Sequence, residues 1–329
     1  MANIELSLAT SYYDHVSDLV HGRVRPESIT LTVMELPVEE IFFRMLNFLE
    51  WDVAEFSMAK YVSLVGSGTA RFRAIPVFPS RVFRHSSFYV ATRAGIQGPQ
   101  DLAGRRLGIP EWAQTAGIYA RSYLQHQCGV SLADIRWVQA GVNQAGRAEK
   151  VSLTLPPGVV IERVQDRSLN EMLLAGDLDG IISAREPTSF LARDSRIARL
   201  WPSYRTVEEA YFQQTGIFPI MHAIVIKEKT LQSHPWMAMN LFNAFELAKN
   251  NSLVRLSSVV NSRVAIPWSH FAFDTARALL GDDVWPYGID PNRTTLAAFL
   301  NFCHEQGVTD RLVEVDELFP REVTKSFKT

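Results

Sequence analysis

The chain has 329 residues, of which 47% are hydrophobic, so it can bury a sizeable core, and its length suggests two compact lobes rather than one. Its 33 basic and 35 acidic residues give a formal charge of -2 without a long run of one sign, which excludes the composition typical of nucleic-acid-binding or polybasic membrane-binding proteins. The two cysteines, Cys128 and Cys303, form neither a CxxC pair nor a metal-ligand spacing, and we interpret them as buried thiols in a reducing compartment.

The N-terminal stretch MANIELSLATSYYDH lacks the basic and apolar regions of a secretory signal. No apolar run approaches the about 18 to 20 residues that span a bilayer. We therefore expect a cytoplasmic protein that contacts neither membranes nor nucleic acid.

The first strand is predicted at residues 4–8, where apolar and polar residues alternate, and the loop SYYDH follows it. Loops at the carboxyl ends of strands face ligands in open α/β sheets. Tyr13, Asp14 and His15 are therefore candidates for a binding site. A turn with a helix cap is the alternative interpretation of the same residues.

Residues 29–34 alternate again and predict a second strand, and residues 37–52 carry apolar residues at helical spacing. A short strand then leads to small residues, with a second helix starting near Ser57 and Met58. This strand and helix order predicts a parallel or mixed sheet covered by helices.

An apolar run at residues 74–91 is interrupted by Arg81, Arg84 and His85. These side chains are costly inside such a run unless they meet an anion or a carboxylate. Pro79 indicates a bend, because proline cannot donate to a central ladder. The run suits the wall of a cleft. An edge strand whose charged residues point to water is the alternative.

Residues 95–124 contain a connector, a short strand LGIP and a helix that starts near Gln114, Thr115 and Ala116. Free backbone N–H groups and the helix dipole attract anions at such a start. The alternative is an ordinary strand-to-helix turn.

Further along, a capped helix and a strand at residues 180–184 end at Arg185, which either binds substrate or pairs with Glu186 or Asp179 at the surface. The second long apolar run, residues 215–226, contains His222, which is either a buried core residue or a catalyst. Both long runs are bent by proline, so they are candidates for paired connections between two lobes. The remainder is mostly helical, with a helix ending on Gly307.

Several blocks of the sequence occur in the order found in a known family: YYDH, LPVEEIFFRML, DVAEFSMAKYV, IPVFPSRVFRHS, GIPEWAQTA, AREP and TGIFPIMH. Together they resemble the 4,5-dihydroxyphthalate decarboxylase family from about residue 4 to residue 250, with a looser match at PYG. The family often has an arginine at the position of His15 and YQMTA where this chain has WAQTA. These departures leave open another hydroxylated aromatic acid as the substrate.

The resemblance implies an α/β fold of the type II periplasmic-binding-protein kind, with two lobes joined by two crossing strands around a central cleft. It implies a first lobe of residues 1–89 and 219–329 and an inserted second lobe of residues 90–218. It also implies decarboxylation of 4,5-dihydroxyphthalate to 3,4-dihydroxybenzoate and CO2.

Such a decarboxylation needs no electron-sink cofactor, because a hydroxyl para to the carboxylate pushes electrons toward the ring carbon that is protonated. The site must hold carboxylates, for which Arg81, Arg84 and the helix start at Thr115 are suited. It must also supply a proton, for which His85 and His222 are both candidates.

A hydroxyl proton needs an acceptor, for which we consider Glu111 and Asp14, because a closed cleft raises the pKa of a carboxylate. Asp14, His15 and Glu111 would be the ligands of a metal, but no compact HxxxH or HxH spacing supports one. We therefore expect neither a metal nor a cofactor.

The sequence leaves rival functions on the same fold. One is a solute-binding protein for an aromatic acid or another small anion, and others are a ligand-sensing module and an enzyme with different chemistry. GxGxxG, GxxxxGK[ST] and GxSxG motifs are missing. We also expect a homo-oligomer, in which the aromatic-rich C-terminal helices face either a partner subunit or the core.

Overall fold

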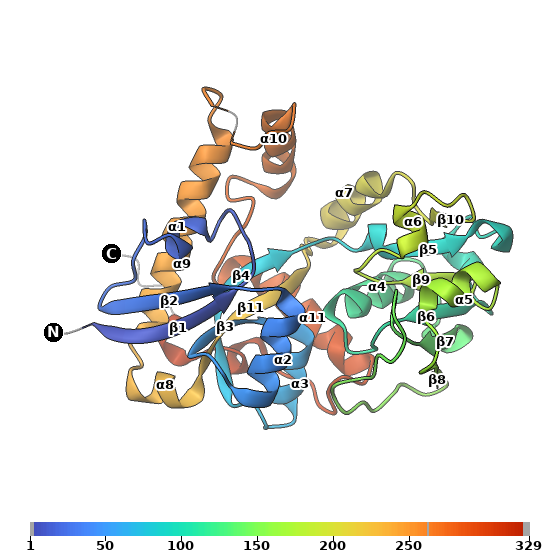
Figure 1. Ribbon diagram of the computed structural model, residues 1–329, viewed down its shortest axis with the longest axis horizontal. Coiled ribbons are helices and arrows are strands. Elements are labelled where there is room, and N and C mark those ends of the chain that lie inside the picture. Colours follow the sequence, from blue (N-terminus) through green and yellow to red (C-terminus); the bar gives the residue numbers. More distant parts are fainter. Residues whose placement is uncertain (1–2, 262, 325–329) are drawn as a thin grey trace.

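The protein is described by a computed structural model that covers residues 3–261 and 263–324. Two β-sheets with helices around them lie side by side (Figure 1), one built from the N-terminal third and a returning strand, the other from the middle of the chain. The mixed α/β, two-lobed fold expected from the sequence is confirmed.

The first sheet has five strands in the order β2-β1-β3-β11-β4. Its strands are β1 (Ile4–Thr10), β2 (Ile29–Glu35), β3 (Val53–Ser57), β4 (Phe72–Arg81) and β11 (Ile220–Lys227). β1, β2 and β3 are parallel, and β11 runs antiparallel to both β3 and β4. The register between β11 and β4 shifts on both sides of His222, which agrees with the bend predicted around Pro79.

The second sheet has six strands in the order β10-β5-β9-β6-β7-β8. Its strands are β5 (Phe88–Ala91), β6 (Arg106–Ile109), β7 (Arg136–Gln139), β8 (Ile161–Arg163), β9 (Gly180–Ile182) and β10 (Ile197–Arg199). The strands β9, β6, β7 and β8 are parallel, which places their carboxyl ends at one edge of the sheet.

Helices follow most strands and cover the sheets. Those of the N-terminal half are α1 (Ser17–Val20), α2 (Val38–Phe48), α3 (Met58–Gly66) and α4 (Thr115–His126). The second sheet adds α5 (Leu169–Ala175), α6 (Thr188–Leu191) and α7 (Tyr204–Thr215), and the C-terminal part adds α8 (Glu228–Ser233), α9 (Met237–Ser257), α10 (Ser269–Leu280) and α11 (Arg293–Glu305). Both predicted helix starts are confirmed, since Ser57 and Gln114 are the N-cap residues of α3 and α4. No helix among the described residues is long and apolar enough to cross a membrane.

Two connections join the sheets. One follows β4 at residues 82–87, and the other lies between α7 and β11 at residues 216–219. β5 starts at Phe88 and already belongs to the second sheet. The first crossing lies within a few residues of residue 89, where the family resemblance implied a lobe boundary, and the exact boundaries of the lobes stay a prediction.

A third contact joins the lobes where the end of α11 meets α4, and we call it the α4–α11 seam, formed by Trp112, Arg121 and Gln306. All three side chains are fully buried. The Arg121 guanidinium stacks on Trp112, with 3.8 Å to the ring centroid, and donates from Nε to Gln306 Oε1 at 2.8 Å. The Trp112 indole N–H donates to the Gln306 carbonyl oxygen at 2.7 Å.

Gly307 extends the seam to the segment between β7 and β8. Its φ is +68°, and its carbonyl oxygen accepts from Thr154 N at 2.9 Å. A Cβ at this position would lie 1.7 Å from Thr154 O, so the close approach of two backbones requires glycine. The predicted C-terminal glycine of this helix is thus also a contact point between the lobes.

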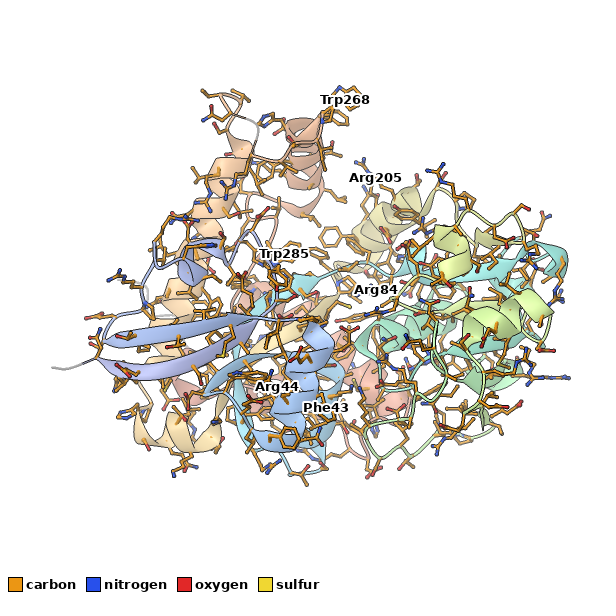
Figure 2. The ribbon with its side chains drawn as sticks, in the orientation of Figure 1. Phe43, Arg44, Arg84, Arg205, Trp268 and Trp285 are labelled. Atoms are coloured by element: carbon orange, nitrogen blue, oxygen red, sulfur yellow. The ribbon has the colours of Figure 1, made fainter. Side chains whose placement is uncertain are left out.

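The α9 and α10 helices form a hairpin: α9 begins against the first lobe, where its N-terminal half is buried, and the far end of the hairpin projects beyond the sheets (Figure 1). α10 has no buried residue, and the tip exposes Val259, Val260 and Trp268 (Figure 2). They lie in the connection between α9 and α10. Of the C-terminal helices, for which the sequence left open a partner subunit or the core, α9 and α11 bury residues in the core, whereas α10 does not.

Candidate active site

A pocket of about 210 Å³ lies between the lobes. Its wall combines four basic side chains with two acidic ones, a histidine and the starts of two helices. The residues are Val38, Glu39, Phe42, Ser57, Lys60, Arg84, Glu111, Gln114, Thr115, Ala116, Arg147, Lys150, Ala184, Met221 and His222. The excess of positive charge favours an anionic ligand.

His222 is placed in the wall by β11, where it pairs with Ser57 on β3 and Ser80 on β4. Its Nδ1 lies 2.6 Å from Glu55 Oε1, and its ring meets Phe42 edge-on, with the ring centroids 4.9 Å apart. The other ring nitrogen, Nε2, makes no hydrogen bond to a described residue and is not sealed from the pocket. Of the two predicted histidines, His222 is the one that lines this pocket.

Glu55 is a residue that the sequence analysis missed. Its carboxylate is fully buried on β3 and accepts hydrogen bonds from Tyr13 Oη at 2.6 Å and Ser11 N at 2.9 Å. A single acidic residue inside the apolar strand VAEFS was the available signal, because a buried carboxylate needs partners.

Arg84 reaches the pocket from the first connection between the lobes (Figure 2). Its Nε lies 3.2 Å from Met221 Sδ. Burial lowers the pKa of Arg84 to about 10, so the guanidinium is protonated at neutral pH. No ion pair to a described residue occupies it, which leaves its fork available for a carboxylate.

Thr115 begins α4 opposite the start of α3, so two helix N-termini meet at the pocket. The Thr115 hydroxyl lies 3.2 Å from Ser57 Oγ and accepts from Ala59 N at 3.1 Å. Neither N-cap residue, Ser57 nor Gln114, caps its helix with its side chain. No N-cap side chain occupies the backbone N–H groups at the start of α4, and anion binding by this helix start stays a prediction.

Glu111 lies at the far end of the pocket within a group of three cations. Arg147 donates to Glu111 Oε1 from Nε at 2.8 Å, Lys60 Nζ lies 3.3 Å from Oε2, and Lys150 Nζ lies 3.6 Å from Oε1. Burial acts to raise the pKa of Glu111, but the three positive charges outweigh it and lower that pKa. The expectation that a closed cleft raises the pKa of Glu111 is therefore wrong.

Lys60 was also missed by the sequence analysis, although it lies in the first turn of α3, next to the predicted helix start. It is 6% exposed, and burial lowers the pKa of its ammonium group against the opposing effect of Glu111. Arg147 and Lys150 come from the segment between β7 and β8.

These contacts give the pocket an order. Arg84 lies beside Met221, the neighbour of His222, and His222 pairs with Ser57, which touches Thr115. Lys60, one turn along α3, then leads to Glu111. The pocket thus runs from a free guanidinium, past an imidazole, to a carboxylate held by cations.

Arg81 lies outside this pocket, contrary to the expectation that it contacts a carboxylate ligand. It is 4% exposed and stacks on Phe218, with 4.3 Å to the ring centroid. Its guanidinium donates to the carbonyl oxygens of Pro286 and Phe218 and to Asn292 Oδ1. With these donors engaged, Arg81 fastens the C-terminal part of the chain to the end of β4.

His85 is also outside the pocket. It lies under α7 in a cage of aromatic rings, with centroid distances of 4.2 Å to Tyr123 and 5.1 Å to Tyr211. Both ring nitrogens are buried and without a hydrogen bond among the described residues, and Glu208 Oε1 is 3.8 Å from Nδ1. His85 therefore does not line the pocket that contains His222.

The loop after β1 supports the pocket from behind. Tyr13 donates to Glu55, and Asp14 is exposed on a turn. His15 Nε2 lies 3.0 Å from the carbonyl oxygen of Pro79, and burial lowers the pKa of His15 to about 4. None of these three residues lines the pocket, so the direct substrate contacts and the acceptor role expected of them are not what the geometry favours.

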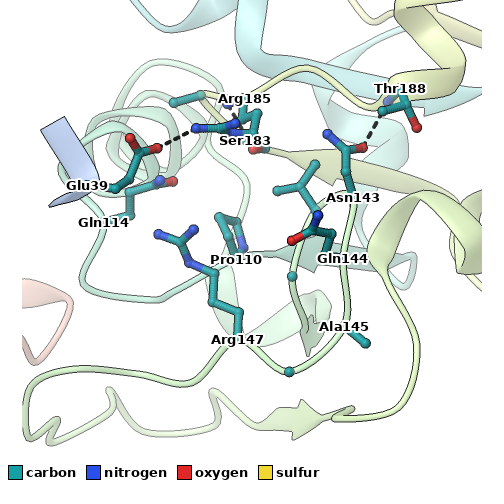
Figure 3. Close-up of a pocket in the computed structure, with 14 residues that line it drawn as sticks. Glu39, Pro110, Gln114, Asn143, Gln144, Ala145, Arg147, Ser183, Arg185 and Thr188 are labelled. Carbon is teal, nitrogen blue, oxygen red and sulfur yellow. Dashed lines mark hydrogen bonds and ion pairs between the residues drawn. The ribbon is translucent and has the colours of Figure 1, made fainter. Parts of the chain in front are cut away.

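Arg185 lies in an outer groove of about 900 Å³ that shares Glu39, Gln114 and Arg147 with the pocket (Figure 3). Its partner is Glu39 on α2, with 2.6 Å between Arg185 Nη2 and Glu39 Oε1. Both side chains are exposed, so this ion pair across the lobes contributes little to stability. The partners suggested by the sequence, Glu186 and Asp179, pair with other arginines.

The structure does not bring Asp14, His15 and Glu111 together as metal ligands, because Glu111 lines the pocket whereas Asp14 and His15 do not. Within residues 3–261 and 263–324, no group of three or more His, Cys, Asp and Glu residues is arranged to hold a metal ion. The cations around Glu111 also occupy its oxygens.

Two curated relatives match the sequence, whereas no family model does. The chain is 35% identical over 329 residues to the 4,5-dihydroxyphthalate decarboxylase of Comamonas testosteroni, covering 100% of both chains. It is 36% identical over 202 residues to the 4,5-dihydroxyphthalate decarboxylase of Pseudomonas putida, which covers 61% of this chain and 78% of the relative.

Solved structures with the same fold include binding proteins and an enzyme. The sulfonate-binding protein SsuA of Methylobacillus flagellatus matches with a TM-score of 0.56 and 12% identity over 97% of this chain and 92% of that one. The aliphatic sulphonate binding protein SsuA of Escherichia coli matches with a TM-score of 0.53 and 12% identity over 98% and 99%. The desulfurization enzyme DSZB matches with a TM-score of 0.51 and 13% identity over 98% of both chains. At these identities the likeness establishes the fold alone.

Proposed function

The chain belongs to the 4,5-dihydroxyphthalate decarboxylase family, and from this premise we propose that it is a carboxy-lyase that converts 4,5-dihydroxyphthalate, or a close hydroxylated aromatic acid, to 3,4-dihydroxybenzoate and CO2. The observation that carries the proposal is His222, a histidine in a basic pocket whose Nδ1 is hydrogen-bonded to the buried carboxylate of Glu55. Such a ring can deliver a proton from a fixed direction.

The order of groups in the pocket fits the substrate. The two carboxylates of 4,5-dihydroxyphthalate are on one edge of the ring and its two hydroxyls are on the opposite edge. Arg84 and the N-terminus of α4 bind the carboxylate edge, where a guanidinium fork and free N–H groups are available. Lys60 and Glu111 contact the hydroxyl edge, where the ionised carboxylate accepts a hydrogen bond.

The reaction consumes one proton for each carboxylate lost. The hydroxyl para to the departing carboxylate donates electron density to the ring, and Glu111 accepts the hydrogen bond of that hydroxyl. His222 Nε2 transfers a proton to the carbon that bears the departing carboxylate. The bond between that carbon and the carboxylate then breaks, CO2 leaves, and the electron pair restores aromaticity. His222 regains its proton from solvent.

Positioning and charge account for most of the expected acceleration. The ring is held at both edges, so its reacting carbon stays next to the imidazole. The hydroxyl oxygen gains positive charge as it donates electron density to the protonated ring, and the carboxylate of Glu111, held by Lys60 Nζ 3.3 Å from its Oε2, stabilises that charge.

The first experiment is absorbance-monitored turnover of 4,5-dihydroxyphthalate by the purified full chain, with identification of the product and a parallel assay in EDTA. We expect 3,4-dihydroxybenzoate in both assays. Turnover that is lost in EDTA and restored by a divalent ion would show that the chemistry described above is incomplete. Tight binding without turnover would support a non-catalytic binding protein for an aromatic acid instead.

The two histidines supply a matched pair of variants. We expect His222→Asn to lower kcat by about 10²- to 10⁴-fold, the range for a lost general acid. His85→Asn changes the histidine outside the pocket and should keep kcat within threefold in protein that remains folded by circular dichroism. Equal losses in both variants would contradict the assignment of the proton donor.

A further inference from the structure

The contacts behind the pocket wall carry an inference about the residues that control His222. Glu55 lies in β3, between β1 and β11, and its carboxylate is fully buried. Its hydrogen-bond partners are Ser11, Tyr13 and His222, and within the described chain it has no lysine or arginine partner. A buried carboxylate without a cationic neighbour is costly, unless the imidazole beside it becomes charged.

The geometry fixes which nitrogen of His222 carries hydrogen. An ionised carboxylate is only an acceptor, so the 2.6 Å contact between Glu55 Oε1 and His222 Nδ1 requires a hydrogen on Nδ1. Nε2 is then the nitrogen open to the pocket. A histidine that loses this partner can rotate or change tautomer, and a misplaced imidazole delivers its proton poorly.

Tyr13 fixes the carboxylate in turn. Its hydroxyl donates to the same Oε1 atom at 2.6 Å, and Ser11 N donates to Oε2 at 2.9 Å. Burial and the charge of Glu55 raise the pKa of Tyr13, so the phenol keeps its hydrogen and remains a donor. With both oxygens engaged, the carboxylate has one orientation toward the imidazole.

We propose that Glu55 and Tyr13 are positioning residues for the reaction, which hold His222 with hydrogen on Nδ1 and with Nε2 turned to the pocket, where Nε2 binds the proton that it transfers to the substrate ring. This inference rests on the proposed function of His222 as the proton donor. Neither residue lines the pocket, so both act through the imidazole. Glu55 also offsets the positive charge of the imidazole when the latter carries the proton to be transferred.

The test uses Glu55→Gln and Tyr13→Phe in the full chain, with Tyr12→Phe as the matched control. Tyr12 is the neighbouring tyrosine, 68% exposed, with its hydroxyl on the Glu35 carbonyl oxygen. We expect kcat to fall by about 10²- to 10⁴-fold in Glu55→Gln and by about 10-fold in Tyr13→Phe, while KM changes less than threefold. Tyr12→Phe should match the wild type.

A merely structural role is separated by combining each variant with His222→Asn. A positioning residue has nothing left to position in that background, so Glu55→Gln and Tyr13→Phe should then lower kcat less than twofold further. Equal losses with and without His222 would overturn the proposal, and so would a Glu55→Gln enzyme that keeps its kcat. If Glu55→Gln does not fold, Tyr13→Phe decides alone.

A measurement without substrate keeps this inference separate from the proposed function. Nitrogen-15 NMR of the histidine rings, at a pH where the rings are neutral, should show hydrogen on Nδ1 of His222 in the wild type, assigned by comparison with His222→Asn. In Glu55→Gln the same spectrum should show His222 with hydrogen on Nδ1 in part of the molecules and on Nε2 in the rest. Hydrogen on Nε2 of His222 in the wild type would overturn the inference, whereas missing turnover with hydrogen on Nδ1 would count against the decarboxylase alone.

Discussion

Replacing Arg84 by alanine is the sharpest perturbation of substrate binding that the geometry allows. The side chain lines the pocket, its only hydrogen bond to a described residue is the 3.2 Å contact with Met221 Sδ, and it has no ion pair within the described chain. Truncation therefore removes little from the fold. It removes the free guanidinium that we assign to the substrate carboxylates.

The size of the effect follows from the fork geometry. A hydrogen bond to a charged group contributes about 1.5 to 3 kcal/mol, and the partly buried position of Arg84 limits the water that competes for a carboxylate. We therefore expect Arg84→Ala to lose about 2 to 4 kcal/mol of transition-state stabilisation, which lowers kcat/KM by roughly 30- to 1000-fold. Arg84→Lys keeps a charge without the fork and should fall between the wild type and alanine.

Steady-state kinetics with 4,5-dihydroxyphthalate measure this loss, and direct binding of the product gives a second estimate of the anion contact. Arg205→Ala is the control, since Arg205 is an exposed arginine of α7 paired with Glu209 (Figure 2). We expect that variant to stay within twofold of the wild type. An Arg84→Ala enzyme with unchanged kcat/KM would refute the assignment of Arg84 to the carboxylates.

Three further expectations concern stability. Burial lowers the pKa of His15 from 6.5 to about 4, so between pH 6.5 and pH 4 the unfolded chain binds a proton that the folded chain excludes. The free energy of unfolding should therefore fall by about 3 kcal/mol as the pH falls from 6.5 to 4. Urea unfolding of His15→Gln should show a smaller fall over the same range, and an equal fall would contradict the burial of His15 as its cause. Gln306→Leu removes the oxygen that accepts from Nε of the buried Arg121, and it should lower the free energy of unfolding in urea by about 3 kcal/mol. The control Gln232→Leu changes an exposed glutamine and should lower it by almost nothing. A decrease below about 1 kcal/mol in Gln306→Leu would show that this amide does not stabilise the α4–α11 seam. The pKa of Asp18 is lowered to about 2, because the charges and hydrogen bonds of Arg255 and Arg23 outweigh the effect of its burial. Asp18→Asn should therefore lower the free energy of unfolding by about 2 kcal/mol at pH 7 but by nearly nothing at pH 2. A decrease that is the same at both pH values would rule out the ion pairs as its cause.

Local patterns were enough to predict most of the fold. Alternation identified β1 and β2, and small residues after short strands located the starts of α3 and α4 at Ser57 and Gln114. These features depend on neighbours in the sequence, which is why a single chain reveals them. The arrangement of the chain in two lobes joined by two crossing strands depends on distant segments and came instead from the family resemblance.

The candidate site was predicted in part, because a charged residue in an apolar run does not reveal its direction. Arg81 and Arg84 are three residues apart at the end of β4, yet one turns into the C-terminal part of the chain and the other into the pocket. The shifts in register beside His222 break the alternation that would have distinguished them.

Glu55 and Lys60 were missed for a related reason. Their partners, His222 and Glu111, are more than 50 positions away in the sequence, and only the pairing of β3 with β11 and the approach of α4 to α3 bring them together. The resemblance placed both residues within a recognised block, but a block does not state which of its side chains meets a ligand.

The α4–α11 seam has a consequence for how a ligand enters and leaves. Two flexible connections alone would let the lobes swing apart as rigid bodies, which is the usual motion of hinged two-lobed proteins. Here Gln306 and Gly307 fasten the lobes at a third place, away from both connections. A third attachment beside the two connections opposes that rotation. The outer groove is lined in part by residues 141–146 (Figure 3). We therefore expect ligand to exchange by local movement of this short segment, so that product release depends on its stiffness rather than on opening of the whole molecule.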